Sequence, residues 1–211
     1  DLGRPLHVFD ANKLNGNLSI RMAKPGEKLQ ALDSKTYDLN KNILIISDDK
    51  EPVSIAGVMG GENTSCDENT TEMFLESAYF HPNYIATSGR QLNILSDARY
   101  RFERGVDPEF VDEGINIMTS LVLDICGGIV SKEVKAGKIS SIRKNIEYDY
   151  SKVLKLGGIK IDKKKQEFFL KGLGFQVEDK KDKLNIKVPS WRHDIDTDVD
   201  IIEEVIRING Y

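Results

Sequence analysis

The stretch Ser54-Ile-Ala-Gly-Val-Met-Gly-Gly-Glu62 carries the main signal for the fold of this chain. A β-branched run, Val53–Ala56, leads into Gly57, Gly60 and Gly61. Glycines let the backbone turn tightly and leave a surface without side chains, where a ligand can approach peptide groups. The spacing matches neither a Walker loop, because its lysine is missing, nor a dinucleotide fingerprint. The stretch therefore predicts a strand and a tight turn, and the turn serves either ordinary packing or ligand contact.

Strand signals surround this turn on both sides. They are short and rich in β-branched or aromatic residues. Residues 29–39 indicate a hairpin, and residues 42–47 and 72–79 each indicate a single strand. Helical signals are fewer. They cover residues 81–89, with a proline near the start and a glycine just past the end, and a longer run from 108 to 126 that stops at two glycines. Because strands and helices do not alternate regularly, we predict the α+β class, with β/β/α layers in this part of the chain.

A polar connection at residues 136–144 divides the chain, and we predict one domain over 1–142 and a second over 143–211. The second domain carries the pattern of a helix, another helix, a hairpin and a last helix, which is typical of a small winged-helix-like α+β domain. These elements are expected at residues 150–158, 163–174, 175–188 and from Thr197 or Asp198 onward.

Charge and composition exclude several classes of function. The net charge is −4, and residues 146–211 hold 13 basic and 13 acidic residues, so nucleic acid would be bound only by a local site or with a partner. No apolar run reaches the ~18 residues that span a bilayer. Cys66 and Cys126 lie far apart and the histidines are scattered, so we expect no metal site and a reducing, cytoplasmic location. The first residues resemble the interior of a longer protein rather than a signal peptide.

Glu76 is the most unusual polar residue, because it lies within the apolar run Phe74–Phe80. A carboxylate in such a strand must be paired or face a cavity. One interpretation is a structural ion pair with Arg101 or Arg104. The other is an acceptor for a hydroxyl group of a substrate. The residues alone leave both interpretations open.

Other polar residues are weaker candidates. His7 lies in a strand-like run, where a lone histidine is usually structural. Ser96 lacks the partners of a Ser/His/Asp constellation, so nucleophilic catalysis is not expected. The mixed charges of residues 99–107 favour a structural network of ion pairs, although phosphate contact is the alternative. Trp191 is interpreted as a packing residue rather than a base-stacking one.

Six blocks of this sequence together resemble the β subunit of bacterial phenylalanyl-tRNA synthetase. The blocks occur in the order of that family and span the whole chain, which makes the match more specific than any single motif. They are residues 4–10 (RPLHVFD), 57–62 (GVMGGE), 75–80 (LESAYF), 96–108 (SDARYRFERGVDP), 189–195 (PSWRHDI) and 202–211 (IEEVIRINGY).

The resemblance implies that residues 1–142 form the B3/B4 editing domain, which in that family hydrolyses tyrosine wrongly esterified to tRNA(Phe). Residues 143–211 would be the B5 domain, with a DNA-binding-like fold. The resemblance also implies that amino-acid activation lies on the α subunit, and that further tRNA-binding, catalytic-like and anticodon-binding parts of the β subunit lie outside this chain.

The resemblance assigns His7, Glu76 and Ser96 to a catalytic set and Gly57, Gly60 and Ala98 to substrate binding. Glu76 would accept the phenolic hydrogen bond, helped by backbone near Gly60. The small side chains of Ser96 and Ala98 would leave room for the ring, and His7 would hold the terminal adenosine or the attacking water. The family often has threonine at the position of Ser96, which implies a slightly looser pocket here. No general base is assigned.

For the whole enzyme the resemblance implies tRNA(Phe) and the α subunit as partners in an α2β2 assembly, without a membrane, in the cytoplasm. ATP and Mg²⁺ would serve the synthetase as a whole, whereas editing would need no cofactor and no metal. Two other classes of function are alternatives. One is a docking module for tRNA or the α subunit that performs no chemistry. The other is a free-standing deacylase, which the second domain disfavours.

Overall fold

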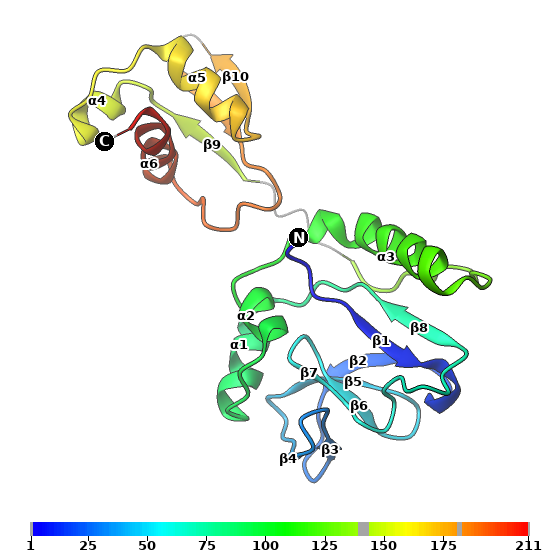
Figure 1. Cartoon of the computed structure of the whole chain (residues 1–211). Helices are drawn as coiled ribbons and strands as arrows, with labels where there is room; N and C mark the ends of the chain where they lie inside the picture. Colours follow the sequence, from blue (N-terminus) through cyan, green and yellow to red (C-terminus); the bar gives the residue numbers. More distant parts are fainter. Residues whose placement is uncertain (1, 139–143, 181–182, 211) are drawn as a thin grey trace. The chain divides into compact units, whose positions relative to one another are not determined.

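A computed structural model describes residues 2–138, 144–180 and 183–210. The chain divides into two compact units, Asp1–Lys138 and Ile139–Tyr211 (Figure 1). Each unit contains both sheets and helices, so the α+β prediction is confirmed. The domain boundary that we predict between residues 142 and 143 lies outside the described residues.

The strands of the first unit form short antiparallel sheets. One sheet has the order β2–β5–β6–β7, made of Ser19–Met22, Leu44–Ser47, Pro52–Ile55 and Met59–Gly60. A hairpin joins β3 (Lys28–Gln30) to β4 (Thr36–Asp38), and a ribbon pairs β1 (His7–Asp10) with β8 (Met73–Glu76). A 3-10 turn, Ala11–Lys13, follows β1. The strands predicted around the glycine turn are therefore present.

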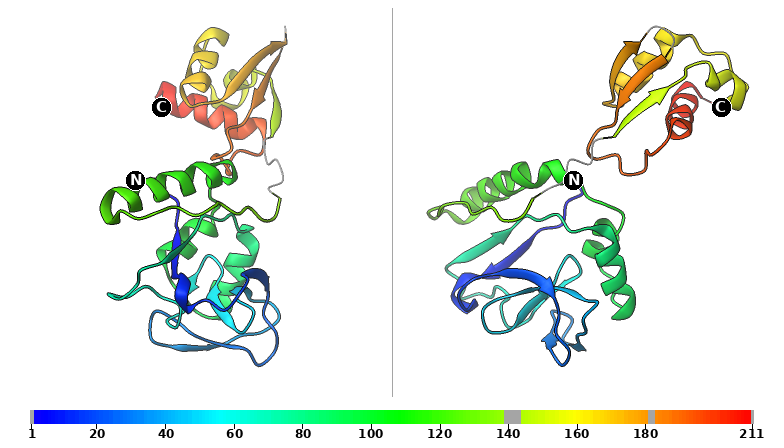
Figure 2. Two further views of the ribbon diagram at one scale, coloured as in Figure 1. Left: turned by 90° about the vertical axis from the view of Figure 1, so that its right-hand side faces the viewer. Right: turned by 180° about the vertical axis from the view of Figure 1, so that it is seen from behind.

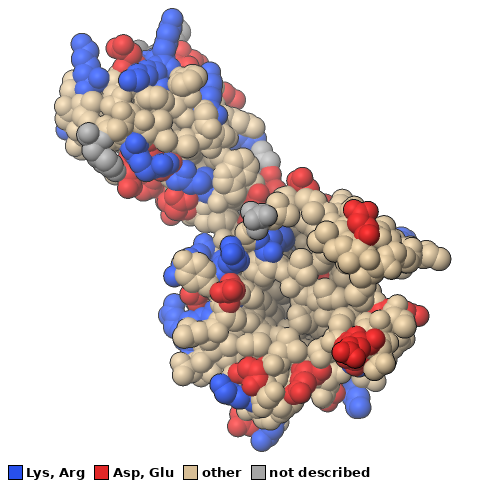
Figure 3. Space-filling view, viewed as in Figure 1, with Lys and Arg blue, Asp and Glu red and all other residues tan. Residues whose placement is uncertain are grey.

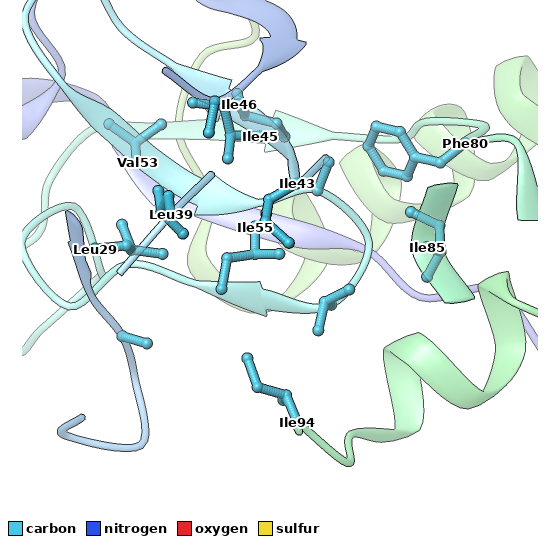
Figure 4. Close-up of a cluster of buried hydrophobic side chains, with 14 of the residues drawn as sticks. Leu29, Leu39, Ile43, Ile45, Ile46, Val53, Ile55, Phe80, Ile85 and Ile94 are labelled. Carbon is cyan, nitrogen blue, oxygen red and sulfur yellow. The ribbon is translucent and has the colours of Figure 1, made fainter. Parts of the chain in front are cut away.

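The core of the first unit lies between the four-stranded sheet and two short helices, α1 (Pro82–Gln91) and α2 (Asp97–Phe102). Ile45 and Ile55 from the sheet and Ile85 from α1 are fully buried. Figure 4 shows Phe80, Ile85 and Ile94 beside the isoleucines of the strands. The β-branched runs of the sequence thus supply the buried faces of β5 and β6.

Helix α1 extends beyond its predicted end at Gly89. Gly89 is needed for close packing and does not end the helix. A Cβ atom on Gly89 would lie 2.3 Å from Cδ of Arg99, whose helix α2 packs against α1. Gly89 is therefore a contact point inside the helix rather than its terminator. Helix α2 itself was absent from the prediction.

Helix α3 (Val111–Cys126) follows a 3-10 turn, Pro108–Phe110, and ends at Gly127 with φ of 70°, as the sequence indicates. Figures 1 and 2 show α3 lying along the β1–β8 ribbon, on the side away from the four-stranded sheet. Gly114 of α3 lies against the side chain of Arg4. The unit therefore has three layers, and the β1–β8 ribbon is the middle layer, between the four-stranded sheet and α3.

The second unit contains the predicted helix, helix, hairpin and helix, and also a strand that was not predicted. Its sheet has the order β10–β11–β9. The elements are β9 (Asn145–Tyr148), α4 (Lys152–Gly157), α5 (Lys163–Gly172), β10 (Gln176–Lys180), β11 (Lys183–Lys187) and α6 (Asp198–Asn209). The apolar residues Phe168, Phe169 and Leu173 are expected from the sequence to form the inward face of α5, and this expectation is partly wrong. Phe168 is 72% exposed, and Gln166 and Leu170 are buried instead. In the described residues of either unit, no helix is both long enough and apolar enough to cross a bilayer.

Gln166 is a buried polar residue that holds the second unit together. Its Oε1 accepts a hydrogen bond from Tyr148 Oη at 2.6 Å, and its Nε2 donates to the carbonyl oxygens of Ile161 and Tyr150 at 2.8 Å and 3.2 Å. We expect Gln166→Leu to lower the free energy of unfolding by about 3 kcal/mol, because the hydroxyl and two carbonyls lose their partner. Urea unfolding checks this. Adding Tyr148→Phe should recover part of the loss, and strictly additive losses would contradict the network.

Candidate functional site

The register of the β1–β8 ribbon brings two candidate residues face to face. His7 lies directly opposite Glu76, at the end of the antiparallel pair. Side chains directly opposite each other point to the same face, with Cβ atoms ~5 Å apart. The ribbon therefore places an imidazole beside a carboxyl group, although the two residues are far apart in the sequence.

Both side chains carry a polar atom that is shielded from solvent and has no hydrogen-bond partner, Nε2 of His7 and Oε2 of Glu76. The alternative of an ion pair between Glu76 and an arginine is wrong for the described residues. Arg104 instead pairs with Glu103 at 3.2 Å, and no ion pair joins Arg101 to Glu76 there. Unpaired buried polar atoms are costly, and a catalytic or ligand-binding role is one of the explanations for them.

Burial shifts both groups toward their neutral forms. It raises the pKa of Glu76 from 4.5 to about 7 and lowers the pKa of His7 below 6.5. Near neutral pH, the imidazole is therefore uncharged, and the carboxyl group is poised between its two protonation states. Such a pair can accept or donate a hydrogen bond to a ligand without a fixed ion pair to break.

This pKa shift predicts a pH-dependent stability. The folded protein holds the Glu76 proton more tightly than the unfolded chain, so stability falls as the pH rises from about 4.5 through 7. We expect Glu76→Gln to raise the free energy of unfolding by up to about 3 kcal/mol at about pH 8, with little effect near pH 4. Urea unfolding at both pH values measures this. An equal effect at both values would show that ionisation of Glu76 is not the cause.

Gly60 is the third member of this group. A Cβ atom at this position would lie 2.3 Å from Cε1 of His7 and 3.0 Å from Cδ1 of Leu32. The imidazole is also in edge-on contact with Phe9, with ring centroids 4.3 Å apart. Glycine is therefore required at position 60 because the histidine ring occupies the space of a side chain.

The other predicted site residues lie at the opposite end of the same turn. Ser96 caps α2, since its Oγ donates to the carbonyl of Val58 at 2.6 Å and accepts from the backbone N–H of Arg99 at 3.1 Å. Ala98 is half-buried against the core. Gly57 has φ of +65° and faces the core, where a Cβ would meet Phe80 and two other side chains at 3.0–3.1 Å. The structure thus separates the predicted set into two groups joined by the turn.

The ion pairs of α2 are largely structural, in line with the favoured interpretation. Arg99 donates to the carboxylate of Glu103 at 2.9 Å and to the carbonyl of Ile94 at 2.6 Å. Glu103 also accepts from Arg104 at 3.2 Å. These bonds brace α2 internally and tie it to Ile94 in the connection between α1 and α2.

Three residues near the site escaped the sequence analysis. Leu32 lies at the β3–β4 turn, and its N–H donates to the carbonyl of Gly60 at 3.0 Å. Phe9 packs on His7, as described above. Arg4 donates to the carbonyls of Ala78 at 2.5 Å and Asp107 at 2.8 Å, so it ties the end of β8 to the chain before α3. The alternation of β1 was a usable signal for Phe9, but no local pattern marks Leu32.

Comparison with protein families identifies the class of this chain. Residues 1–127 match the B3/4 domain and residues 146–211 match the tRNA synthetase B5 domain. The chain belongs to the B3/4 domain family, and its second unit carries the B5 domain. The resemblance to the phenylalanyl-tRNA synthetase β subunit is thereby confirmed.

The curated relatives are phenylalanine–tRNA ligase β subunits. That of Paramagnetospirillum magneticum is 48% identical over 211 residues, and that of Mesorhizobium japonicum is 47% identical over 210 residues. Both matches cover all of this chain but 26% of the relative, so the chain spans about a quarter of their length. Among solved structures, an N-terminal fragment of the phenylalanyl-tRNA synthetase β subunit from Pyrococcus horikoshii matches 98% of this chain and 60% of its own, with a TM-score of 0.51 and 16% identity. This last match shows a shared fold.

Proposed function

We propose that the first unit hydrolyses the ester between tyrosine and tRNA(Phe), as an editing site of phenylalanine–tRNA ligase. Water adds to the ester carbonyl, the bond to the ribose oxygen breaks, and free tyrosine and tRNA are released. The observation that carries this proposal is the facing pair of His7 and Glu76, each with an unpartnered, buried polar atom.

Selection between tyrosine and phenylalanine rests on one hydroxyl group. A site that hydrogen-bonds a hydroxyl can reject the analogue without it by roughly 10⁴–10⁵-fold, because its own polar group is then left unpaired. Oε2 of Glu76 is such a group. In the proposed complex it accepts the phenolic O–H, and its desolvation cost is offset only when tyrosine is bound.

The remaining site residues have supporting roles in this proposal. His7 stays neutral because burial lowers its pKa, and its Nε2 holds the attacking water or the terminal adenosine. Gly60 has no side chain and so leaves space for the imidazole of His7, and Gly57 supplies the left-handed backbone of the turn. Ser96 and Ala98 fix and border the ring slot from α2. Their small side chains support this role, since small residues leave room for a ring.

A second candidate is a docking module that binds tRNA or the α subunit without chemistry. This alternative is supported by the tRNA synthetase B5 domain, which directly follows the B3/4 domain in this chain. For the whole enzyme we propose an α2β2 assembly in the cytoplasm. ATP and Mg²⁺ belong to aminoacylation on the α subunit, and no step proposed for the first unit uses them.

The two candidates are separated by deacylation of tyrosyl-tRNA(Phe) and phenylalanyl-tRNA(Phe) by this chain. We expect the tyrosyl ester to be hydrolysed at least about 100-fold faster, because it alone satisfies Glu76. A folded chain that binds tRNA but hydrolyses neither ester would support the docking module. Equal rates for the two esters would contradict recognition of the hydroxyl.

A further inference from the structure

Helix α2 and its flanks present cationic, aromatic and apolar side chains on one surface of the first unit. We call this surface the α2 edge and define it by Leu95, Tyr100, Arg101 and Arg104, with Arg90 in the last turn of α1. All five residues are exposed. Figure 3 shows lysine and arginine side chains gathered over the part of this unit where Figure 1 places α1 and α2.

The α2 edge is basic although the whole chain is acidic. Residues 82–104 contain four arginines and two acidic residues, a net charge of +2, whereas the whole chain carries −4. Glu103, one of the two acids, is neutralised by Arg99 and Arg104. Asp97, which is exposed, remains as the opposing charge. Among the residues with described side chains, no acidic group forms an ion pair with Arg90 or Arg101.

Two large non-charged side chains stand out from this basic surface. Leu95 is 87% exposed and Tyr100 is 59% exposed. The guanidinium of Arg104 lies 3.8 Å from the ring centroid of Tyr100, so cation and ring form one stacked pair. Single-stranded nucleic acid binds to surfaces on which exposed aromatic rings alternate with arginines. The bases stack on the rings, and the phosphates pair with the cations.

The α2 edge also adjoins the candidate site. A groove of about 500 Å³ is lined by Leu95, Ser96, Asp97, Arg99, Tyr100 and Glu103. Ser96 connects this groove to the glycine turn through its hydrogen bond to Val58. Arg101 extends toward the N-terminal segment, where its Nη1 lies 3.7 Å from a Cβ placed on Gly3, ahead of β1 and His7. A strand of RNA on this surface would therefore lead toward His7 and Glu76.

We propose that the α2 edge binds the single-stranded RNA segment that carries the ester. The identity of the RNA rests on the proposed function, but the surface is assigned by its own chemistry. Arg90, Arg101 and Arg104 pair with phosphates, and Tyr100 and Leu95 contact bases. An acidic protein partner would use the cations without needing an exposed ring beside them, so single-stranded RNA is the better fit.

The test is fluorescence anisotropy of this chain with a labelled single-stranded RNA of about eight nucleotides, titrated at several salt concentrations. We expect the wild-type chain to bind, and Tyr100→Ala to weaken binding about tenfold without changing the salt dependence. The double variant Arg101→Gln/Arg104→Gln should reduce the slope of log K against log salt by about 1.4. Lys28→Gln/Lys35→Gln, on the β3–β4 hairpin, removes the same charge and is the matched control.

Equal weakening by the two double variants would overturn the proposal, because it would show attraction by net charge alone. So would the absence of RNA binding by a chain that still hydrolyses the tyrosyl ester of adenosine, which lacks the RNA strand. Failure of the editing proposal looks different. RNA would then bind and depend on Tyr100, while neither this small ester nor tyrosyl-tRNA would be hydrolysed.

Discussion

Replacing Glu76 by alanine is expected to lower kcat/KM for the tyrosyl ester by about 100-fold and to change that for the phenylalanyl ester by less than about threefold. The reason is that a hydrogen bond to a charged acceptor contributes about 2–3 kcal/mol when the partner is otherwise buried and unpaired. Phenylalanine makes no such bond, so the substitution should hardly change kcat/KM for its ester. Deacylation of both esters by both proteins, under the same conditions, measures the effect.

Stability separates this role from a structural one. Oε2 of Glu76 has no hydrogen-bond partner to abandon, so the alanine variant should unfold at the same temperature as wild type or a higher one. Glu72→Ala is the matched control, because Glu72 is exposed just before β8. If Glu76→Ala lowered the melting temperature and both rates together, Glu76 would be a structural residue and the assignment would fail.

Replacing Gly60 by alanine is expected to remove most of the hydrolysis of the tyrosyl ester, by about 100-fold, and to destabilise the fold by about 1–3 kcal/mol. The added methyl group would lie 2.3 Å from Cε1 of His7, so the imidazole has to move. A displacement of ~1 Å at a catalytic group is enough for a loss of this size. Deacylation rates and urea unfolding of the same variant give the two quantities.

A double variant distinguishes a collision between the new methyl group and the His7 ring from a general defect of the turn. Gly60→Ala combined with His7→Ala removes the ring that the methyl group strikes, so stability should largely return while hydrolysis should not. Gly172→Ala provides a glycine control, since a Cβ there meets no atom within 4 Å. Loss of stability that persists in the double variant would show that the turn, and not His7, requires glycine at position 60.

The sequence predicted those elements whose signals are local. The β-branched runs before and after residue 48 became β5 and β6, and the glycines after residue 126 ended α3. Helix α2 was missed because its six residues are too few to show a helical period among so many charges. Gly89 was misjudged because its role depends on the side chain of Arg99, which only tertiary packing brings to it.

The candidate site divides in the same way. The apolar run around Glu76 marks that residue as unusual, and the family resemblance points to His7 and Glu76 individually. Their meeting depends on the register of β1 with β8, which no local pattern contains. Gly57 and Gly60 look alike in sequence, yet one faces apolar core side chains and the other an imidazole ring. Only the neighbours supplied by the fold distinguish the two.

The central claim is that Glu76 recognises the phenolic hydroxyl, and binding without chemistry tests it most directly. The ligands are adenosine derivatives that carry tyrosine or phenylalanine through a hydrolysis-resistant 3′-amide, and calorimetry measures their affinities. We predict that wild type binds the tyrosyl compound about 30–100-fold more tightly, which corresponds to about 2–3 kcal/mol, and that Glu76→Ala binds both compounds alike. Equal affinities for wild type, or a preference that survives in Glu76→Ala, would contradict the account.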